Sequence, residues 1–145
     1  MGDTSSGTLL QGLLRAIAPN QPRSLLPRVA LDPPTFLLPH DRSILLGRDP
    51  GCHVAVDAEA YPIVSRHHAL LEPLREFGTI LGWRAIDRQS ANGTLINGKP
   101  IRVWDLHSGD RLQLGQDGPE FLYTCVSGDS PTQIEKPQPR TPPQG

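Results

Sequence analysis

The sequence lacks an excess of charge of either sign, because 14 basic and 15 acidic residues give a formal net charge of −1. A nucleic-acid-binding domain normally carries a basic face, so this balance argues against nucleic acid as a partner. Lysine is scarce: 12 of the basic residues are arginines, and only Lys99 and Lys136 are lysines. The planar arginine fork binds phosphate through paired hydrogen bonds, so the bias is compatible with phosphate binding, although genome composition produces the same bias.

Cysteines and long hydrophobic runs are also scarce. Cys52 and Cys125 lie far apart without neighbours at metal-ligand spacing, so we expect buried thiols in a reducing compartment. No segment approaches the roughly 20 apolar residues that a membrane-spanning helix requires. The N-terminus lacks the basic and apolar regions of a secretory signal. We therefore expect a cytoplasmic protein without a membrane span.

Proline and glycine, by contrast, are abundant, with 16 and 14 residues. This composition favours short strands joined by many turns. A chain of 145 residues has room for one ordinary domain and its tails. We divide it into an N-terminal extension, residues 1–23, a domain, residues 24–127, and a proline-rich tail, residues 128–145. The tail has no apolar periodicity and is expected to be a disordered linker.

The domain is predicted to consist of short strands bounded by turn residues. Alternating apolar residues and frequent turn signals are typical of an all-β sandwich. The expected strands are Arg28–Leu31, Thr35–Leu38, Ser43–Leu46, His53–Val56, Ala69–Leu71, Trp83–Asp87, Thr94–Ile96, Pro100–Val103, Arg111–Leu114 and Glu120–Val126.

The N-terminal extension contains an apolar pattern of a different period. The residues at helical spacing are Leu9, Leu10, Leu13, Leu14 and Ile17. With Thr8 as a cap and Pro19 as the end, this pattern predicts a short amphipathic helix. Such a helix packs on its own domain, frays or docks a partner.

Three motifs fall in loops of the predicted sandwich: Gly47-Arg48, Ser65-Arg66-His67-His68, and Asn92-Gly93-Thr94 followed by Asn97-Gly98. In this order and at this spacing they resemble the forkhead-associated (FHA) domain family. Further matches are Gly51-Cys52-His53-Val54 and Leu106–Leu112 with Gly115. The resemblance covers the middle of the chain, about 100 residues, the usual size of a sandwich domain. It implies an eleven-stranded β-sandwich whose loops at one end bind a phosphothreonine peptide.

The resemblance assigns phosphopeptide binding to Arg48, Ser65, Arg66 and Asn92. Arg48 offers a rigid donor fork, Ser65 a hydroxyl and Arg66 a second positive charge, which together suit a phosphate dianion. The amide of Asn92 carries both a donor and an acceptor, so it can pair with the backbone of an extended peptide. Without the resemblance, an arginine beside a glycine is an ordinary solvated loop residue.

A second set of residues is expected to hold the loops in place: Gly47, His68, Gly93, Thr94 and Asn97. The Asn-Gly pairs are typical of tight hairpin turns. Neighbouring strand residues point to opposite faces, so His67 and His68 are not expected to form a metal or catalytic site. The resemblance implies that His68 supports the binding loops from behind and that Cys52 is packed.

Two positions bear on affinity and selectivity. Members of the FHA family that bind tightly often carry Ser or Thr where this chain has Ala91. A lost charge-assisted hydrogen bond costs ~1.5–3 kcal/mol, about one to two decades in affinity. Ile63 occupies a position that the resemblance links to selectivity three residues after the phosphothreonine. Its apolar side chain predicts an aliphatic preference there. Arg88, in a neighbouring loop, is an alternative source of charge at that place.

The function expected first is a phosphothreonine-binding adaptor downstream of a Ser/Thr kinase. The alternative, which Ala91 keeps open, is a phosphate-independent scaffold that docks partners by another surface. An enzyme ranks last, because the chain has no glycine-rich nucleotide loop, no suitably spaced carboxylate pair and no nucleophile with an evident base. We expect no metal and no cofactor. The expected partner is a threonine-phosphorylated protein, and Thr132 in the tail, if phosphorylated, is a candidate self-ligand.

Overall fold

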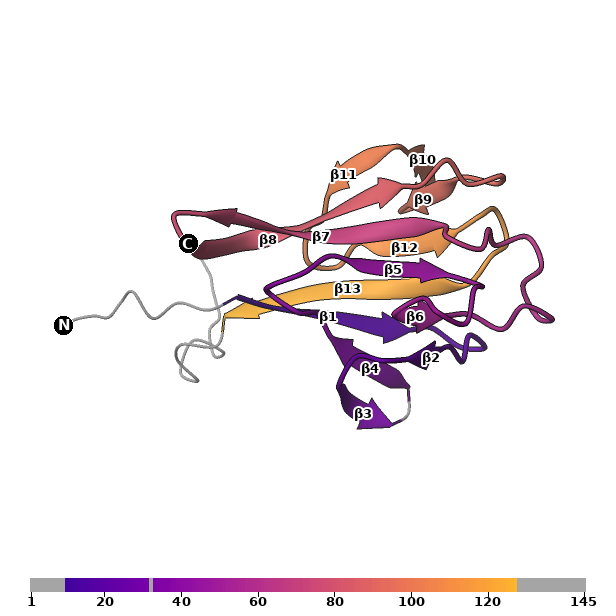
Figure 1. Ribbon diagram of the computed structural model, residues 1–145, viewed down its shortest axis with the longest axis horizontal. Helices are drawn as coiled ribbons and strands as arrows, with labels where there is room; N and C mark the ends of the chain where they lie inside the picture. The colour runs from indigo at the N-terminus through magenta and orange to yellow at the C-terminus, as the bar shows by residue number, and fades with distance from the viewer. Residues whose placement is uncertain (1–9, 32, 128–145) are drawn as a thin grey trace, which may run out of the picture.

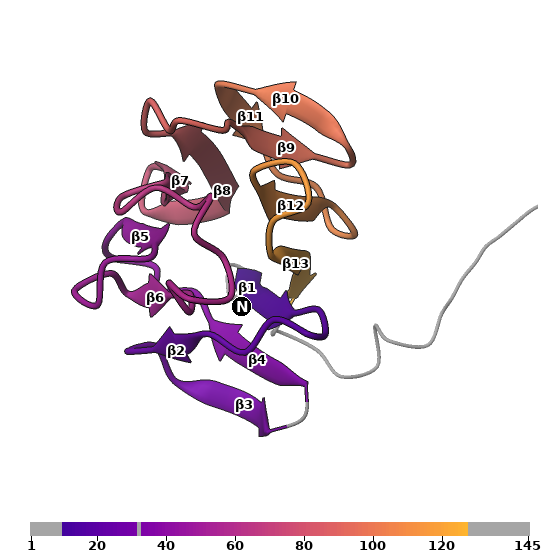
Figure 2. The same cartoon turned by 90° about the vertical axis from the view of Figure 1, so that its right-hand side faces the viewer.

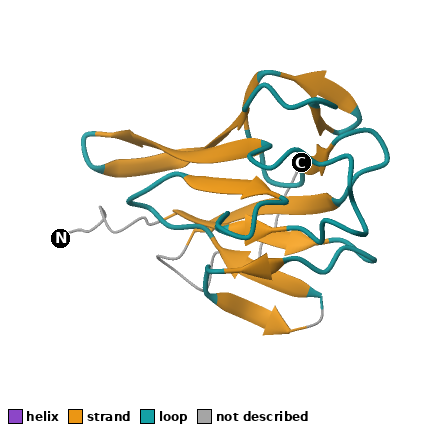
Figure 3. Cartoon of the chain, turned by 45° about the vertical axis from the view of Figure 1, so that its right-hand side comes forward, coloured by secondary structure: helices purple, strands orange, loops and turns teal. Residues whose placement is uncertain are grey.

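The computed structural model describes residues 10–31 and 33–127, which form thirteen strands stacked in two sheets (Figure 1). No helix occurs in the described residues (Figure 3). This part of the chain therefore holds no helix of the length and apolarity that crossing a membrane requires. The strands are β1 (Leu10–Ala16), β2 (Arg23–Ser24), β3 (Arg28–Leu31), β4 (Pro34–Leu37), β5 (Ile44–Gly47), β6 (Val54–Ala55), β7 (Ala69–Glu76), β8 (Thr79–Asp87), β9 (Thr94–Ile96), β10 (Lys99–Ile101), β11 (Val103–Asp105), β12 (Arg111–Leu114) and β13 (Glu120–Ser127).

The two sheets face each other as a sandwich, which Figure 2 shows from one end. The larger sheet has seven strands in the order β10-β9-β12-β13-β1-β4-β3, and the smaller has six in the order β11-β8-β7-β5-β6-β2. Neighbouring strands are antiparallel apart from the short β5–β6 pair, which is parallel. The predicted all-β sandwich is confirmed, with thirteen strands in the described residues where the resemblance implied eleven.

The core between the sheets is built around the indole of Trp83, which is 1% exposed. Tyr123 and His40 lie beside this ring, with centroid separations of 6.4 and 5.8 Å. A Cβ atom on Gly12 would approach the Trp83 ring to 3.0 Å and Leu38 to 2.9 Å. Gly12 therefore leaves room for the Trp83 side chain, the largest in the core, and so permits close packing of the interior.

The helix predicted over residues 8–17 is wrong. Leu10–Ala16 forms β1, which pairs with β13 on one side and β4 on the other. Gly12, Leu14 and Ala16 alternate toward the core. An isolated helix of this length is marginal in water, whereas a strand between two partners satisfies its backbone on both edges. The sandwich therefore begins before residue 24, and the expectations for Thr8, Leu9 and the tail after residue 127 lie outside the described residues.

The strands predicted within residues 24–127 all occur, and three of them, β3, β9 and β12, have the predicted bounds. The segment Pro100–Val103, predicted as one strand, contains a sheet change. Its first part lies in β10 of the larger sheet, and after Arg102 the chain continues as β11 of the smaller sheet. Alternation alone does not reveal such a change, because both parts are extended.

The loops that carry the sequence motifs meet at one end of the sandwich, on the right in Figure 1. They follow β5, precede β7 and join β8 to β9. The β7–β8 hairpin turns at the opposite end, with Phe77 at its tip. The fold therefore gathers segments that are distant in sequence around a single surface.

Candidate functional site

Two of the loops are joined along their backbones. The amide of Arg48 donates to the carbonyl of Ser65 over 3.1 Å, and that of Asp49 donates to Arg66 over 3.2 Å. A Cβ atom on Gly47 would lie 2.1 Å from the Arg66 carbonyl oxygen. Only glycine allows this approach, so Gly47 fixes the spacing of the two loops.

The guanidinium of Arg48 is anchored at one nitrogen and open at the other two. Its Nε donates to the carbonyl of Val64 over 2.7 Å. Within the described residues, neither Nη has a hydrogen-bond or ion-pair partner. Arg48 therefore presents a half-buried, oriented pair of donors, which matches the geometry of a phosphate or carboxylate.

Ser65 and Asn92 connect the next pair of loops. The hydroxyl oxygen of Ser65 accepts the Ala91 amide over 3.0 Å, which leaves the hydroxyl proton for an outside acceptor. The side-chain amide of exposed Asn92 donates to the Ile63 carbonyl over 2.7 Å. Its carbonyl oxygen and second N–H remain available to a ligand.

Arg66 is largely exposed and points toward an acidic neighbour. Its Nη2 lies 3.9 Å from Oδ2 of Asp49, and Nε2 of His67 lies 3.4 Å from the same oxygen. The other oxygen of Asp49 accepts the Gly51 amide over 2.8 Å. This hydrogen bond is the main reason that the pKa of Asp49 lies below its ordinary value. Arg66 is thus held loosely and can turn to a ligand.

His68 lies behind these loops and is fully buried. Its Nδ1 accepts the Ser65 amide over 3.0 Å, which puts the ring proton on Nε2, and Nε2 donates to the Gly93 carbonyl over 2.7 Å. Burial lowers the pKa of His68, so the neutral ring is favoured. His67, by contrast, is exposed. Neither histidine lies in a strand, so the strand alternation assumed for this pair was wrong, but one ring is exposed and the other is buried, as expected. His68 links the Ser65 loop to the Asn92 loop.

Asp87 is a residue that the sequence analysis did not identify. Its Oδ1 accepts the hydroxyls of Ser90 and Thr94 over 2.5 and 2.7 Å, and its Oδ2 accepts the Ser90 amide over 3.2 Å. The Ser90 hydroxyl also accepts the Gly93 amide over 2.9 Å. Burial raises the pKa of Asp87, but the hydrogen bonds from Ser90 and Thr94 outweigh it, so the pKa lies below its ordinary value. An Asp followed three residues later by Ser is the local signal for such a turn.

Asn97 lies apart from the other predicted site residues. It occupies the turn between β9 and β10, where Asn97 and Gly98 both have positive φ, 53° and 84°. Its side chain donates to Asp110 over 3.0 Å and accepts the Arg111 amide over 3.0 Å. Asn97 therefore shapes the β9–β10 hairpin and not the loops around Arg48.

Ile63 is half-buried, and its side chain packs against the core. Its Cδ1 lies 3.1 Å from the point where a Cβ on Gly115 would stand, and the Asn92 Cβ lies 3.3 Å from the same point. The absence of a side chain on Gly115, whose φ is +92°, lets both residues pack there. Part of Ile63 is therefore turned inward and not toward a ligand.

The comparisons with known proteins agree on one domain type. Residues 44–115 match the family model of the FHA domain. Over 129 residues the chain is 28% identical to the E3 ubiquitin-protein ligase RNF8 of Homo sapiens, covering 75% of this chain and 26% of that protein. Over 90 residues it is 36% identical to the ABC transporter ATP-binding/permease protein Rv1747 of Mycobacterium tuberculosis, covering 61% of this chain and 9% of the relative. The chain thus spans about a quarter or less of these relatives.

Solved structures show the same architecture. The crystal structure of M. tuberculosis Rv1747 FHA-1 has a TM-score of 0.55 and 25% identity, covering 79% of this chain and 96% of that one. The NMR structure of the yeast Dun1 FHA domain, solved with a doubly phosphorylated (pT) peptide derived from Rad53 SCD1, has a TM-score of 0.60 and 24% identity, covering 97% and 91%.

Proposed function

Because this chain belongs to the FHA domain family, we propose that it is an adaptor module that binds threonine-phosphorylated peptides downstream of a Ser/Thr kinase. The single observation that carries the proposal is the set of open groups at one loop end: both Nη of Arg48, the hydroxyl proton of Ser65 and the amide of Asn92. A phosphate dianion has only acceptor oxygens, and these donors complement them.

Arg48 is proposed to form the strongest phosphate contact and Ser65 the second. Arg66 adds a positive charge after it turns from Asp49. Asn92 binds the peptide backbone, because an exposed amide with one donor and one acceptor left open complements a peptide group. Asn92 therefore sets the direction of the peptide and not its sequence. The similar yeast Dun1 FHA domain was solved with a doubly phosphorylated (pT) peptide, which supports phosphothreonine binding as the function proposed here.

The alternative, a phosphate-independent scaffold, is favoured by one observation. Ala91 has no hydroxyl, and the neighbouring Ser90 hydroxyl already donates to Asp87 and accepts from Gly93. Ser90 is therefore not free to replace the missing contact. Against this, the groups of Arg48, Ser65 and Asn92 remain open.

Calorimetric titration with a matched pair of peptides separates the two functions. The peptide is chosen from an oriented phosphothreonine library and prepared with and without the phosphate. Binding of the phosphorylated form alone is expected. Equal affinity for the two forms would replace the proposal with the scaffold. The proposal also includes an upstream kinase, a cytoplasmic location and a phosphorylated Thr132 as self-ligand. The self-ligand is tested by treating the wild-type chain and Thr132→Ala with kinase. Tighter binding of added peptide by Thr132→Ala would support it.

A further inference from the structure

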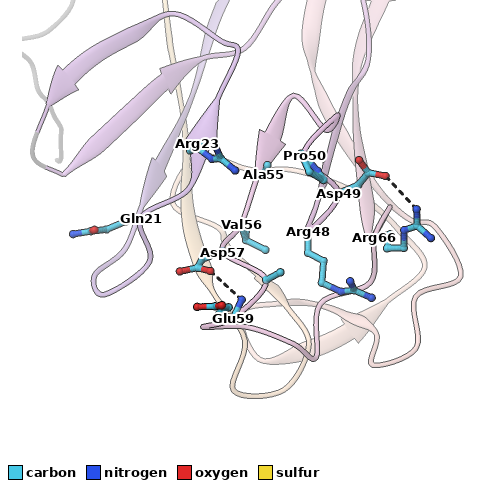
Figure 4. A pocket seen from close by; sticks show the side chains of 11 residues that line it. Gln21, Arg23, Arg48, Asp49, Pro50, Ala55, Val56, Asp57, Glu59 and Arg66 are labelled. Carbon is cyan, nitrogen blue, oxygen red and sulfur yellow. Dashed lines mark hydrogen bonds and ion pairs between the residues drawn. The ribbon is translucent and has the colours of Figure 1, made fainter.

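A hollow of about 670 Å³ adjoins the proposed phosphate site. It is lined on one side by Arg48 and Arg66 and has an apolar floor of Pro50, Ala55 and Val56 (Figure 4). Ligand pockets in proteins commonly have ~300–1,000 Å³, so the hollow holds more than a phosphate group. Space for a neighbouring side chain of the peptide therefore exists beside the phosphate.

The end of the hollow away from the two arginines is acidic. Asp57 and Glu59 lie together there, on the other side of Val56 from Arg48 (Figure 4). A tight turn fixes them, since Oδ1 of Asp57 accepts the Glu59 amide over 2.9 Å and its backbone carbonyl accepts the Tyr61 amide over 2.9 Å. We name this pair of carboxylates the acidic end.

No cation of the described chain neutralises the acidic end. Neither carboxylate forms an ion pair there, in contrast to Asp49, which contacts Arg66 and His67. Arg23 of β2 also lines the hollow, but it makes no ion pair with either carboxylate. The hollow is therefore bipolar, with free donors at one end and free carboxylates at the other.

We propose that the acidic end is a specificity subsite for a lysine or arginine side chain that precedes the phosphothreonine. This inference rests on the proposed function. Ile63, to which we assign the residue three positions after the phosphothreonine, does not line the hollow, so the hollow receives residues on the other side. In an extended peptide, side chains two residues apart point the same way. The cation therefore belongs two residues before the phosphothreonine, and its alkyl stem packs on the apolar floor.

An anionic residue at that position is disfavoured. Asp57 and Glu59 repel a carboxylate or a second phosphate. The single positive charge of Arg23 does not offset their two negative charges. Arg23 also reduces the attraction for a cation, because it adds a like charge to the same hollow. Removing the charge of Arg23 and removing the charges of the acidic end should therefore change selectivity in opposite directions.

The test measures fluorescence anisotropy of phosphothreonine peptides that differ only two residues before the phosphothreonine, where they carry Arg, Ala or Glu. The 145-residue chain is compared with the double variant Asp57→Asn/Glu59→Gln and with Arg23→Gln. Asn at position 57 keeps an acceptor for the Glu59 amide, so the turn is retained. The Ala peptide is the internal control for folding and for phosphate binding.

The wild-type chain is expected to bind the Arg peptide about three- to tenfold more tightly than the Ala peptide, as partly solvated ion pairs allow. The double variant should reduce this ratio to near one, and Arg23→Gln should raise it. A ratio near one in the wild type, or tighter binding of the Glu peptide, would overturn the subsite. Unphosphorylated versions of the three peptides distinguish the two failures: if they bind equally well, the proposed function itself fails.

Discussion

The site consists of two layers that differ in how completely their polar groups are paired. The inner layer, His68, Asp87 and Thr94, is buried or half-buried, and each of its side chains has a protein partner within 3.0 Å. In the outer layer, Arg48, Ser65 and Asn92 each use one group for an internal bond and leave the others open.

This difference explains how short loops can present a defined surface. The inner layer links the Ser65, Gly93 and Thr94 segments, so the loops are already ordered before a ligand arrives. Ordering flexible loops on binding lowers affinity, and pre-ordered loops avoid this cost. Variants of the outer layer should therefore change binding alone, whereas variants of the inner layer should change stability and binding together.

The largest loss of binding is expected for Arg48→Ala. Two charge-assisted hydrogen bonds to phosphate are lost, at ~1.5–3 kcal/mol each, so affinity for the phosphorylated peptide should fall at least about 100-fold. The melting temperature should stay close to the wild-type value. Arg48→Lys should also lose much of the binding, because one point charge does not replace the fork.

Calorimetry of the variants measures the affinity, and thermal unfolding followed by circular dichroism measures the stability. Arg42→Ala is the matched control, since Arg42 is an exposed arginine outside the loops that form the proposed site and, among the described residues, pairs with Asp41 alone. Unchanged affinity in Arg48→Ala would remove Arg48 from the site.

The second prediction concerns the inner layer. His68→Ala leaves the Ser65 amide and the Gly93 carbonyl without their partner, at ~1–3 kcal/mol for each buried group. We expect a melting temperature at least ~8 °C lower and weaker phosphopeptide binding in the same variant. Normal stability with lost binding would make His68 a direct ligand contact instead.

The pH dependence of the free energy of unfolding independently tests whether His68 is buried in its neutral form. Burial lowers its pKa from the ordinary value of 6.5, so below pH 6.5 the unfolded chain binds a proton that the folded chain does not. The stabilisation is complete above pH 6.5 and is lost as the pH falls from there to the lowered pKa, by at most ~1.4 kcal/mol per pH unit. Urea unfolding between pH 7 and 5 should show this slope in the wild type and not in His68→Ala.

The strands were largely predictable from the sequence, but β1 was not. After residue 24, turn residues flank each apolar segment, and these flanking residues make the strands predictable. In β1 the doublets Leu9-Leu10 and Leu13-Leu14 fit helical spacing as well as a strand. The deciding facts, the pairing with β13 more than 100 residues away and the contact between Gly12 and Trp83, are tertiary.

The residues of the outer layer could be picked out because they stand in recognisable motifs, and their binding role stays a prediction. Asp87 was missed because an aspartate at the end of a strand has no distinctive neighbours apart from Ser90, three residues later. Asn97 was predicted as a loop residue within an Asn-Gly hairpin signal, and it does lie in a turn, the one between β9 and β10. The β9 strand separates Asn97 from Asn92 in space, and Asn97 bonds Asp110.

The third prediction is a gain of phosphopeptide binding when a hydroxyl is added beside the outer layer. The Ala91 amide lies 3.0 Å from the Ser65 hydroxyl, so a side chain at position 91 stands beside the outer layer. Ala91→Thr adds a hydroxyl there, and affinity for the phosphorylated peptide should rise about tenfold, at the low end of one charge-assisted hydrogen bond. The Ser90 hydroxyl, one residue earlier, does not replace this group because it is already bonded to Asp87.

Ala91→Val is the matched control, because valine has the shape of threonine without the hydroxyl. Calorimetry should show the gain for threonine only. A similar gain for both variants would assign it to shape or to loop stiffness.

The smallest effect is expected at Ile63, which lies between the two layers: its carbonyl accepts from Asn92, and its side chain packs against the core. An aliphatic residue three positions after the phosphothreonine should be preferred, because Ile63 offers apolar surface and no charge. Full burial of such a side chain contributes ~1.5–3 kcal/mol, but Ile63 is already half-buried, so only part of that area remains and the preference over alanine should be about three- to fivefold. Ile63→Arg should reverse the preference toward Asp or Glu. An oriented phosphopeptide array with both proteins checks this. Acidic enrichment with the wild-type chain would instead implicate exposed Arg88, and the array repeated with Arg88→Gln would then lose it.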